Sequence, residues 1–345
     1  MKPREEIEHI IGHEEVRPVP YTLAWEGDIC ERLGRHYGDP EWHTRIRQYF
    51  LWTGAVDTMR RGPVEGKEGW AKDLYGSVWR YDRRPFHLET PGLPEPTFDG
   101  YKWPAPEKFF ADAEGIAAAN KICDEYKDKR YVIAGLGWGM LEHSWGIRGF
   151  ENVLMDVAAE PDFFEELLDR LTDQFLAYVD FTCKSLPDID AVFFGDDWGD
   201  QRGVIVGPER WRRYFKPRWA KIYDRVHSYG KVTMSHCCGS VVDIMDDVIE
   251  IGLDVFESMQ PEARGMNPYE LKKQWGDKIT FWGCLGSQST LAFGTPREIQ
   301  AEVRKLCREM GKGGGYILAP AKAFQTEMST EQAAAVVDAA MNQDA

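Results

Sequence analysis

Hydrophobic and polar positions follow two alternating patterns from about residue 107 to the end of the chain. Short continuous apolar runs, typical of strands buried on both faces of a parallel sheet, are separated by longer segments with helical spacing. The apolar runs predict strands at 130–137, 190–196, 231–236, 253–258, 278–284 and 315–320. The segments around them predict helices at 106–126, 161–186, 208–229, 240–251, 267–275, 296–311 and 329–341.

Repeated strand–helix units over this length predict an α/β protein with a distorted (β/α)8 TIM barrel rather than a doubly wound sheet. A dinucleotide-binding fold is disfavoured because GLGWG at 135–139 follows a predicted strand but lacks the G-x-G-x-x-G spacing. Residues 1–106 are dense in Trp, Tyr, Pro and charge, too polar and interrupted to form a regular sheet alone. We therefore expect a helical and irregular N-terminal elaboration at 1–106, packed on a barrel at 107–345.

The balance of charge narrows the classes of partner. The chain has 345 residues, with 42 Lys and Arg against 57 Asp and Glu, a net charge of −15. Such a surface repels phosphate backbones and anionic lipids, which excludes nucleic acid and membrane surfaces as expected partners. With no apolar run of ~18 residues and no signal-peptide core at the start, we expect a cytoplasmic protein. Seven cysteines, two of them adjacent, indicate reduced thiols rather than a disulfide scaffold.

The sequence SHCCG at 235–239 ends one predicted strand, where barrel enzymes place their catalytic groups. His236 and Cys238 are two residues apart and should project to the same side of an extended segment, with Cys237 turned into the packing. Cys284 ends a later strand, and one imidazole with two thiolates is the ligand set of a catalytic zinc. Glu257 is an alternative ligand or an inter-loop ion-pair partner. The alternative is a hydrogen-bonded histidine with packed cysteines and no metal.

A second group of candidates follows the predicted strand 190–196. Asp196 and Asp197 would repel each other, which raises a carboxyl pKa and suits proton transfer. Asp200 more simply caps the loop or pairs with an arginine. Trp198 would give a planar ligand a flat wall. Lys322, after the last strand, could bind an anion or protonate a leaving oxygen, although most lysines are simply solvated.

The segment GLGWGMLEHSW at 135–145 places further polar and aromatic side chains around one turn after a strand. Trp138, Glu142 and His143 are therefore candidates for substrate binding. A lone histidine such as His143 is also consistent with a structural role in the core.

These motifs carry a resemblance to a known family. The order FFGDDWGDQRG, HCCG, FWGCLGSQ and GKGGGYILAP, within about 107–341, resembles the uroporphyrinogen decarboxylase superfamily. That resemblance implies a distorted (β/α)8 barrel, in either a decarboxylase or a zinc- and corrinoid-dependent methyltransferase. The stretch VRPVPYTLAWEGDICERL at 16–33 lacks the paired arginines by which decarboxylases hold propionates, and Lys322 stands where decarboxylases have a late histidine.

The methyltransferase branch is matched by the H-x-C pair, His236 and Cys238. Its coenzyme M members carry a third zinc cysteine in the last barrel loop, where 319–325 has none, so Cys284 or Glu257 would have to replace it. The resemblance thus implies Zn2+ on this chain and methyl transfer between a small methylated substrate, such as a methyl ether, or a thiol and a corrinoid protein. Asp197, Glu257 or Lys322 would supply the proton, and a homodimer would be ordinary for such a barrel.

Two other functions stay open from the sequence. One is a metal-free decarboxylase-type lyase for a tetrapyrrole carboxylate, using Asp196 or Asp197. The other is a non-catalytic barrel that binds tetrapyrroles or corrinoids. Because the chain lacks the D-x-H-x-x-G signature of a corrinoid-binding domain, any cobalamin would arrive on a partner protein.

Overall fold

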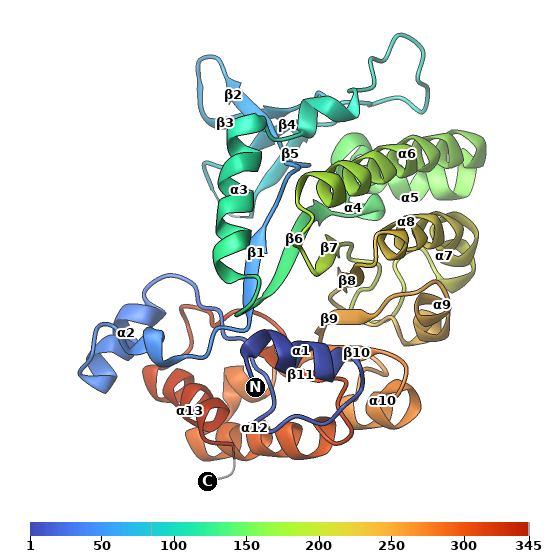
Figure 1. The fold of residues 1–345 in the computed structure, drawn as a ribbon. Coiled ribbons are helices and arrows are strands. Elements are labelled where there is room, and N and C mark those ends of the chain that lie inside the picture. Colours follow the sequence, from blue (N-terminus) through green and yellow to red (C-terminus); the bar gives the residue numbers. More distant parts are fainter. Residues whose placement is uncertain (84, 344–345) are drawn as a thin grey trace.

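The computed structural model describes residues 1–83 and 85–343 and is built around a curled parallel sheet (Figure 1). The sheet has seven strands in the order β1-β6-β7-β8-β9-β10-β11, with parallel pairing throughout. The strands are β1 (Phe50–Thr53), β6 (Tyr131–Trp138), β7 (Ala191–Gly195), β8 (Val232–His236), β9 (Val255–Met259), β10 (Thr280–Leu285) and β11 (Tyr316–Pro320). The predicted barrel architecture is confirmed as TIM-barrel-like, with seven strands rather than eight in the described chain.

The sheet does not close by pairing β1 with β11 within the described residues. Instead the N-terminal segment lies along β11, where Tyr21 forms an isolated parallel bridge with Leu318. The amide of Thr22 donates to the carbonyl of Leu318, and the amide of Leu318 donates to the carbonyl of Pro20. This segment therefore covers the edge that an eighth strand would cover.

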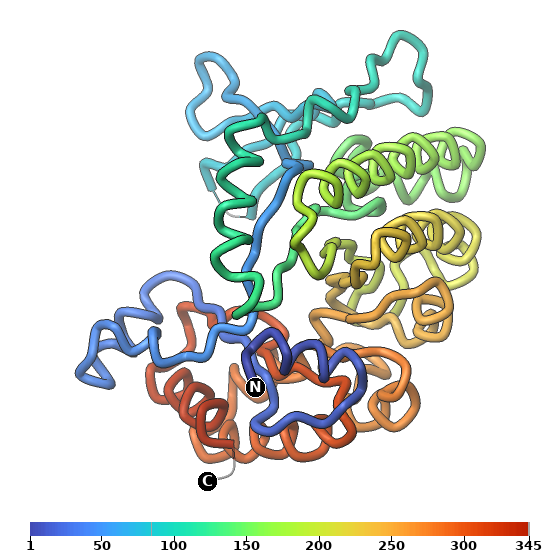
Figure 2. The backbone as a smooth tube through the Cα atoms, in the orientation of Figure 1, coloured from blue at the N-terminus to red at the C-terminus, as the bar shows by residue number. Residues whose placement is uncertain are grey.

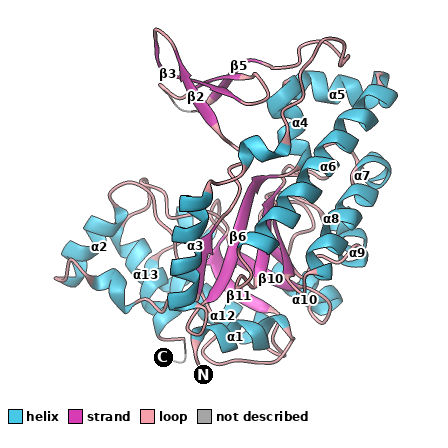
Figure 3. Ribbon diagram, turned by 45° about the horizontal axis from the view of Figure 1, so that its top comes forward, coloured by secondary structure: helices cyan, strands magenta, loops and turns pink. Residues whose placement is uncertain are grey.

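Helices follow the strands and cover the outer face of the sheet (Figure 3). Each apolar run predicted as a strand forms a strand. These strands are apolar because helices cover the outer face of the sheet and side chains fill its curled interior. The predicted helix 208–229 is instead two helices that meet at Phe215, because Pro217 has no N–H to continue the first. The helices are α3 (Ala113–Tyr126), α4 (Met140–Arg148), α5 (Phe150–Ala159), α6 (Pro161–Ser185), α7 (Pro208–Tyr214), α8 (Lys216–Ser228), α9 (Met245–Glu250), α10 (Pro268–Trp275), α11 (Thr290–Phe293), α12 (Pro296–Met310) and α13 (Thr330–Met341).

The segment before residue 107 contributes more regular structure than its composition suggests. It supplies β1 to the main sheet and also forms a separate antiparallel sheet, β2-β3-β4-β5, which stands off the barrel in Figure 1. The expectation that this region forms no sheet of its own is corrected. Tight turns such as Glu65–Gly66, with Gly66 at φ +72°, join neighbouring strands and make the pairing local. The strands are β2 (Arg61–Val64), β3 (Lys67–Asp73), β4 (Val78–Arg80) and β5 (His87–Thr90).

The N-terminus and the last helix, α13, lie at the same end of the molecule (Figure 2). The helices α1 (Pro3–Ile11) and α2 (Ile29–Tyr37) belong to this region. The side chain of Gln343 accepts from the Val19 amide at 2.8 Å and donates to its carbonyl at 2.8 Å. None of the helices in the described part of the chain combines the length and apolar character that a bilayer-spanning helix requires.

Candidate metal centre and adjoining cavity

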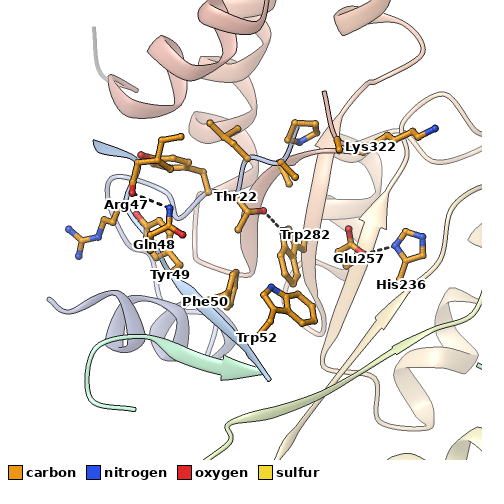
Figure 4. A pocket seen from close by; sticks show the side chains of 18 of the residues that line it. Thr22, Arg47, Gln48, Tyr49, Phe50, Trp52, His236, Glu257, Trp282 and Lys322 are labelled. Carbon is orange, nitrogen blue, oxygen red and sulfur yellow. Dashed lines mark hydrogen bonds and ion pairs between the residues drawn. The ribbon is translucent and has the colours of Figure 1, made fainter. Parts of the chain in front are cut away.

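Three neighbouring strands bring polar and aromatic side chains to one row across the sheet. The register pairs His236 of β8 with Glu257 of β9, and Glu257 with Trp282 of β10. Residues in register on parallel strands share a face of the sheet, and all three side chains line one cavity (Figure 4). The row lies toward the carboxyl ends of the strands, where barrel proteins assemble their sites.

Asp197, His236 and Cys238 form the candidate metal centre. One potential ligand atom from each lies within 4.8 Å of the other two. The Cys238 Sγ is 3.3 Å from His236 Nε2, and Asp197 Oδ1 is 3.6 Å from the same nitrogen. The amide of Cys238 donates to Asp197 Oδ1 at 2.8 Å, which holds the loop after β7 against the loop after β8. A carboxylate, an imidazole and a thiol are a donor set that zinc accepts, and three protein ligands leave one position open.

Glu257 orients the histidine of this cluster from the other side of the ring. Its Oε2 is 2.5 Å from His236 Nδ1, so Nε2 faces the cysteine and the aspartate. Burial lowers the pKa of His236, but the carboxylate of Glu257 and the Cys238 thiol outweigh it and raise the pKa above its ordinary value. A carboxylate that holds the remote nitrogen of a metal-binding histidine fixes its tautomer and raises its basicity. Glu257 is therefore placed as the support of His236 rather than as an alternative ligand.

Cys284 lies away from the cluster, which corrects the predicted ligand set. The register of β10 shifts between Trp282 and Gly283, and Cys284 itself has φ +74°. This irregularity breaks the strand's simple alternation, so Cys284 does not share the cavity face with Trp282. Its buried thiol lies beside Tyr316 and close to Lys272 of α10, and burial raises its pKa. Asp197, and not Cys284, is the third member of the candidate metal centre.

Asp196 is a structural carboxylate and not an exposed proton donor. It is fully buried and accepts four N–H donors, from the indoles of Trp198 and Trp219 and from the amides of Leu141 and Glu142. Burial raises its pKa to about 7, and the four donors oppose that rise. The ring of Trp198 is itself fully buried, so the expectation that Trp198 walls a ligand site is corrected.

Trp138 and His143 also lie away from the cavity. His143 is buried among Tyr75, Trp138 and Phe175, and this burial lowers its pKa to about 4, so the ring is neutral. Trp138 packs against Trp79 of the antiparallel sheet at 5.6 Å between ring centroids. Both residues therefore attach the antiparallel sheet to the barrel, and their predicted role in substrate binding is not supported by their positions.

Glu142 lies close enough to the cluster for the charges of Asp197 and His236 to affect its pKa. Burial is the largest cause that raises its pKa to about 8, followed by the negative charges of Asp196 and Asp197. Glu142 therefore holds a proton near neutral pH beside the candidate ligand Asp197.

Glu142 should make the stability of the metal-free protein depend on pH. Its carboxyl takes up a proton on folding between its ordinary pKa of 4.5 and its folded value of about 8. Stability should consequently fall as pH rises through this window, and Glu142→Gln should reduce that fall. Urea unfolding at pH 5, 6.5 and 8 with a chelator present measures the difference. The matched control is Glu151→Gln, at an exposed position of α5; parallel curves for wild type and Glu142→Gln would contradict the assignment.

The cluster opens on a cavity of about 560 Å³, the size of a small-molecule site. Its walls combine the strand ends with residues of the N-terminal segment and β1. Lys322 is exposed and belongs to the lining of this cavity, where Figure 4 labels it. The N-terminal share of the lining was not predicted from the sequence, although the apolar run YFLW at 49–52 was a signal for it. The lining includes Tyr21, Thr22, Arg47, Gln48, Tyr49, Phe50, Trp52, His236, Cys238, Glu257, Trp282, Pro320 and Lys322.

The curled parallel sheet makes this a TIM-barrel-like protein, and its candidate metal centre lies toward the carboxyl ends of the strands, where such proteins place their sites. The profile of the family described as Uroporphyrinogen decarboxylase (URO-D) matches residues 116–343, and the chain belongs to this family. The resemblance seen in the sequence motifs is thereby confirmed.

The chain is also similar to two curated relatives and, in its fold, to a solved structure. A "Methylcobamide:CoM methyltransferase MtaA" of Methanosarcina barkeri is 30% identical over 159 residues, 46% of this chain and 43% of the relative. The same enzyme from strain Fusaro is 29% identical over an equal stretch. The match thus spans less than half the length of these relatives. The structure of a methyltransferase from Methanosarcina mazei superposes with a TM-score of 0.68 at 20% identity, covering 99% of each chain, which shows a shared fold.

Proposed function

We propose that the protein is a zinc-dependent methyltransferase that moves a methyl group between a small substrate and a corrinoid carried by a partner protein. The observation that carries the proposal is the cluster of Asp197, His236 and Cys238, two of whose members, His236 and Cys238, line a cavity large enough for a small molecule. The family and the names of the methyltransferase relatives support the same reaction class.

The residues present fit a zinc ion. Asp197, His236 and Cys238 would hold it, and bound zinc would act as a Lewis acid on the heteroatom that gains or loses the methyl group. Glu257 would keep His236 Nε2 turned toward the ion. In the demethylating direction the bond between methyl carbon and heteroatom would break with its electron pair left on the heteroatom, and a cobalt(I) corrinoid on the partner protein would supply the electron pair for the new bond to the methyl carbon. Glu142 or Lys322 would supply or accept the proton that the heteroatom exchanges.

Charge in the cavity disfavours the lyase alternative. Apart from His236, which belongs to the candidate metal centre, Arg47 and Lys322 are the only cationic side chains among the described lining residues. The Arg47 guanidinium is already engaged by Glu6 and by the carbonyl of Met1. A tetrapyrrole with several carboxylates needs several cations, so this cavity suits a neutral or singly charged ligand better.

The test combines elemental analysis with an assay of methyl transfer. Protein purified without added metal is expected to contain about one zinc per chain and to transfer methyl groups between cob(I)alamin and a methyl donor, or from methylcobalamin to a thiol. Chelation should abolish the activity, and restored zinc should return it. Decarboxylation of a tetrapyrrole by the chelated protein would support the lyase. Tight corrinoid binding without any turnover would support a binding protein.

A further inference from the structure

The residue between the two ligands of the H-x-C pair is itself a cysteine, Cys237, and it connects the loops of the candidate metal centre. Cys237 is fully buried, whereas Cys238 is partly exposed and lines the cavity. Neighbouring residues of an extended segment point to opposite sides, so the Cys237 thiol faces the packing between the loops. It is not a member of the ligand cluster, and its role depends on its hydrogen bonds.

The thiol of Cys237 joins the loop after β7 to the loop after β8. The amides of Gly199 and Trp198 both donate to Cys237 Sγ, the second at 3.2 Å. The S–H of Cys237 donates to the carbonyl of Cys238 at 3.1 Å, as a thiol can act as both acceptor and donor. Trp198 directly follows Asp197, so one sulfur atom contacts the backbone beside one candidate ligand and the backbone of another.

The main chain of Cys237 reaches the next strand as well. Its amide donates to the carbonyl of Glu257 at 2.5 Å. Glu257 is the residue whose carboxylate lies against His236 Nδ1. Cys237 therefore contacts three successive segments of the barrel, and each of them supplies a ligand or the support of a ligand.

The loops after β7 and β8 approach each other too closely for side chains to lie between them. A Cβ at Gly199 would lie 2.6 Å from the carbonyl oxygen of Ser240, and a Cβ at Gly239 would lie 2.6 Å from the carbonyl oxygen of Gly199. Backbone thus meets backbone along these loops, and the thiol of Cys237 connects them at the end next to the ligands. The separation of the ligands depends on this contact as well as on the strands.

We propose that Cys237 is a positioning residue for zinc, whose buried thiol fixes Asp197 and Cys238 relative to each other without binding the ion. This inference rests on the proposed zinc site and adds the residue that holds its geometry. Because the ligands are ordered when the protein folds, zinc binding has less conformational entropy to overcome. Groups that orient metal ligands typically contribute about 10- to 100-fold in metal affinity.

The experiment measures the zinc Kd of the full, metal-free chain by competition with a chromophoric chelator. Cys237→Ala and Cys237→Val remove the hydrogen bonds of the thiol at two side-chain volumes, and each should weaken zinc binding about 10- to 100-fold. Cys237→Ser keeps a donor and an acceptor and should bind zinc within about threefold of the wild type. Cys183→Ala removes a buried thiol from α6; it is the matched control and should leave the Kd unchanged.

Cobalt(II) bound in place of zinc reports the geometry of the ligands directly. Its visible absorption bands depend on the arrangement of the donor atoms. They should change in Cys237→Ala and Cys237→Val and stay as in the wild type in Cys237→Ser and Cys183→Ala. Urea unfolding of each metal-free variant shows whether the chain is folded under the titration conditions, which separates lost positioning from lost folding.

A folded Cys237→Ala or Cys237→Val variant with the zinc affinity and cobalt spectrum of the wild type would overturn the inference. The proposed function would still stand in that case if Cys238→Ala loses zinc. A Cys237→Ser variant that binds zinc as weakly as Cys237→Ala would also overturn it, because the hydrogen bonds would then not be the cause. Failure of the wild type to bind zinc would overturn the proposed function and this inference together.

Discussion

Replacing Cys238 by alanine is expected to remove bound zinc and lower the rate of methyl transfer at least about a thousandfold. Its Sγ lies 3.3 Å from His236 Nε2, within the candidate cluster. Replacing Cys284 by alanine should leave zinc content and rate near those of the wild type and cost only about 1 kcal/mol of stability, because its thiol is buried beside Tyr316.

Cys284→Ala is a matched control for Cys238→Ala, since each variant removes one thiol near the end of a strand in the same sheet. Elemental analysis of each variant gives the metal content, and the corrinoid assay gives the rate. His236→Ala should reproduce the Cys238→Ala result. Zinc retained in Cys238→Ala would refute the candidate metal centre. Loss of zinc from Cys284→Ala as well as from Cys238→Ala would instead restore the ligand set expected from the sequence, His236, Cys238 and Cys284.

Asp196 and Asp197 are adjacent, but replacing Asp196 should mainly lower stability, whereas replacing Asp197 should mainly lower zinc content. Asp196→Ala should lower the free energy of unfolding by at least about 3 kcal/mol, because four buried N–H donors lose their acceptor. Asp197→Ala should change stability by less than about 1.5 kcal/mol, since the main bond it loses is the one from the Cys238 amide. Its effect should fall on zinc content instead.

Asp200→Ala provides a control from the same loop. Its carboxylate accepts from the amides of Arg202 and Gly203 in an exposed turn, so we expect a loss of about 1 kcal/mol and no change in zinc. Urea unfolding of metal-free protein and elemental analysis of purified protein measure the two effects separately. A metal-free Asp196→Ala variant as stable as the wild type would contradict the structural role of this carboxylate.

The sequence predicted the barrel well and the site in part. Each predicted strand exists, because long apolar runs between amphipathic helices leave few alternatives to a buried parallel sheet. The H-x-C pair was found for a similar reason, since extended backbone brings residues two apart to the same side. Cys284 was misplaced because its prediction assumed an unbroken strand, and the bulge at Gly283 is not visible in the pattern.

Composition gave an incomplete picture of the first 106 residues. Their polar and aromatic character led to the expectation of irregular structure, yet they contribute β1, the antiparallel sheet and much of the cavity wall. Phe50 and Trp52 meet Trp282 across a separation of more than 200 residues, and no local spacing encodes such a contact.

The chain's own order of residues determined the βα repeat and the pairing of His236 with Cys238, because helix and strand periods act over a few neighbouring positions. The tertiary structure alone decided that Asp197 joins that pair, that Glu257 supports the histidine and that aromatic rings from distant strands share one wall. Those outcomes depend on register and curvature of the whole sheet, which arise only when distant segments pack together.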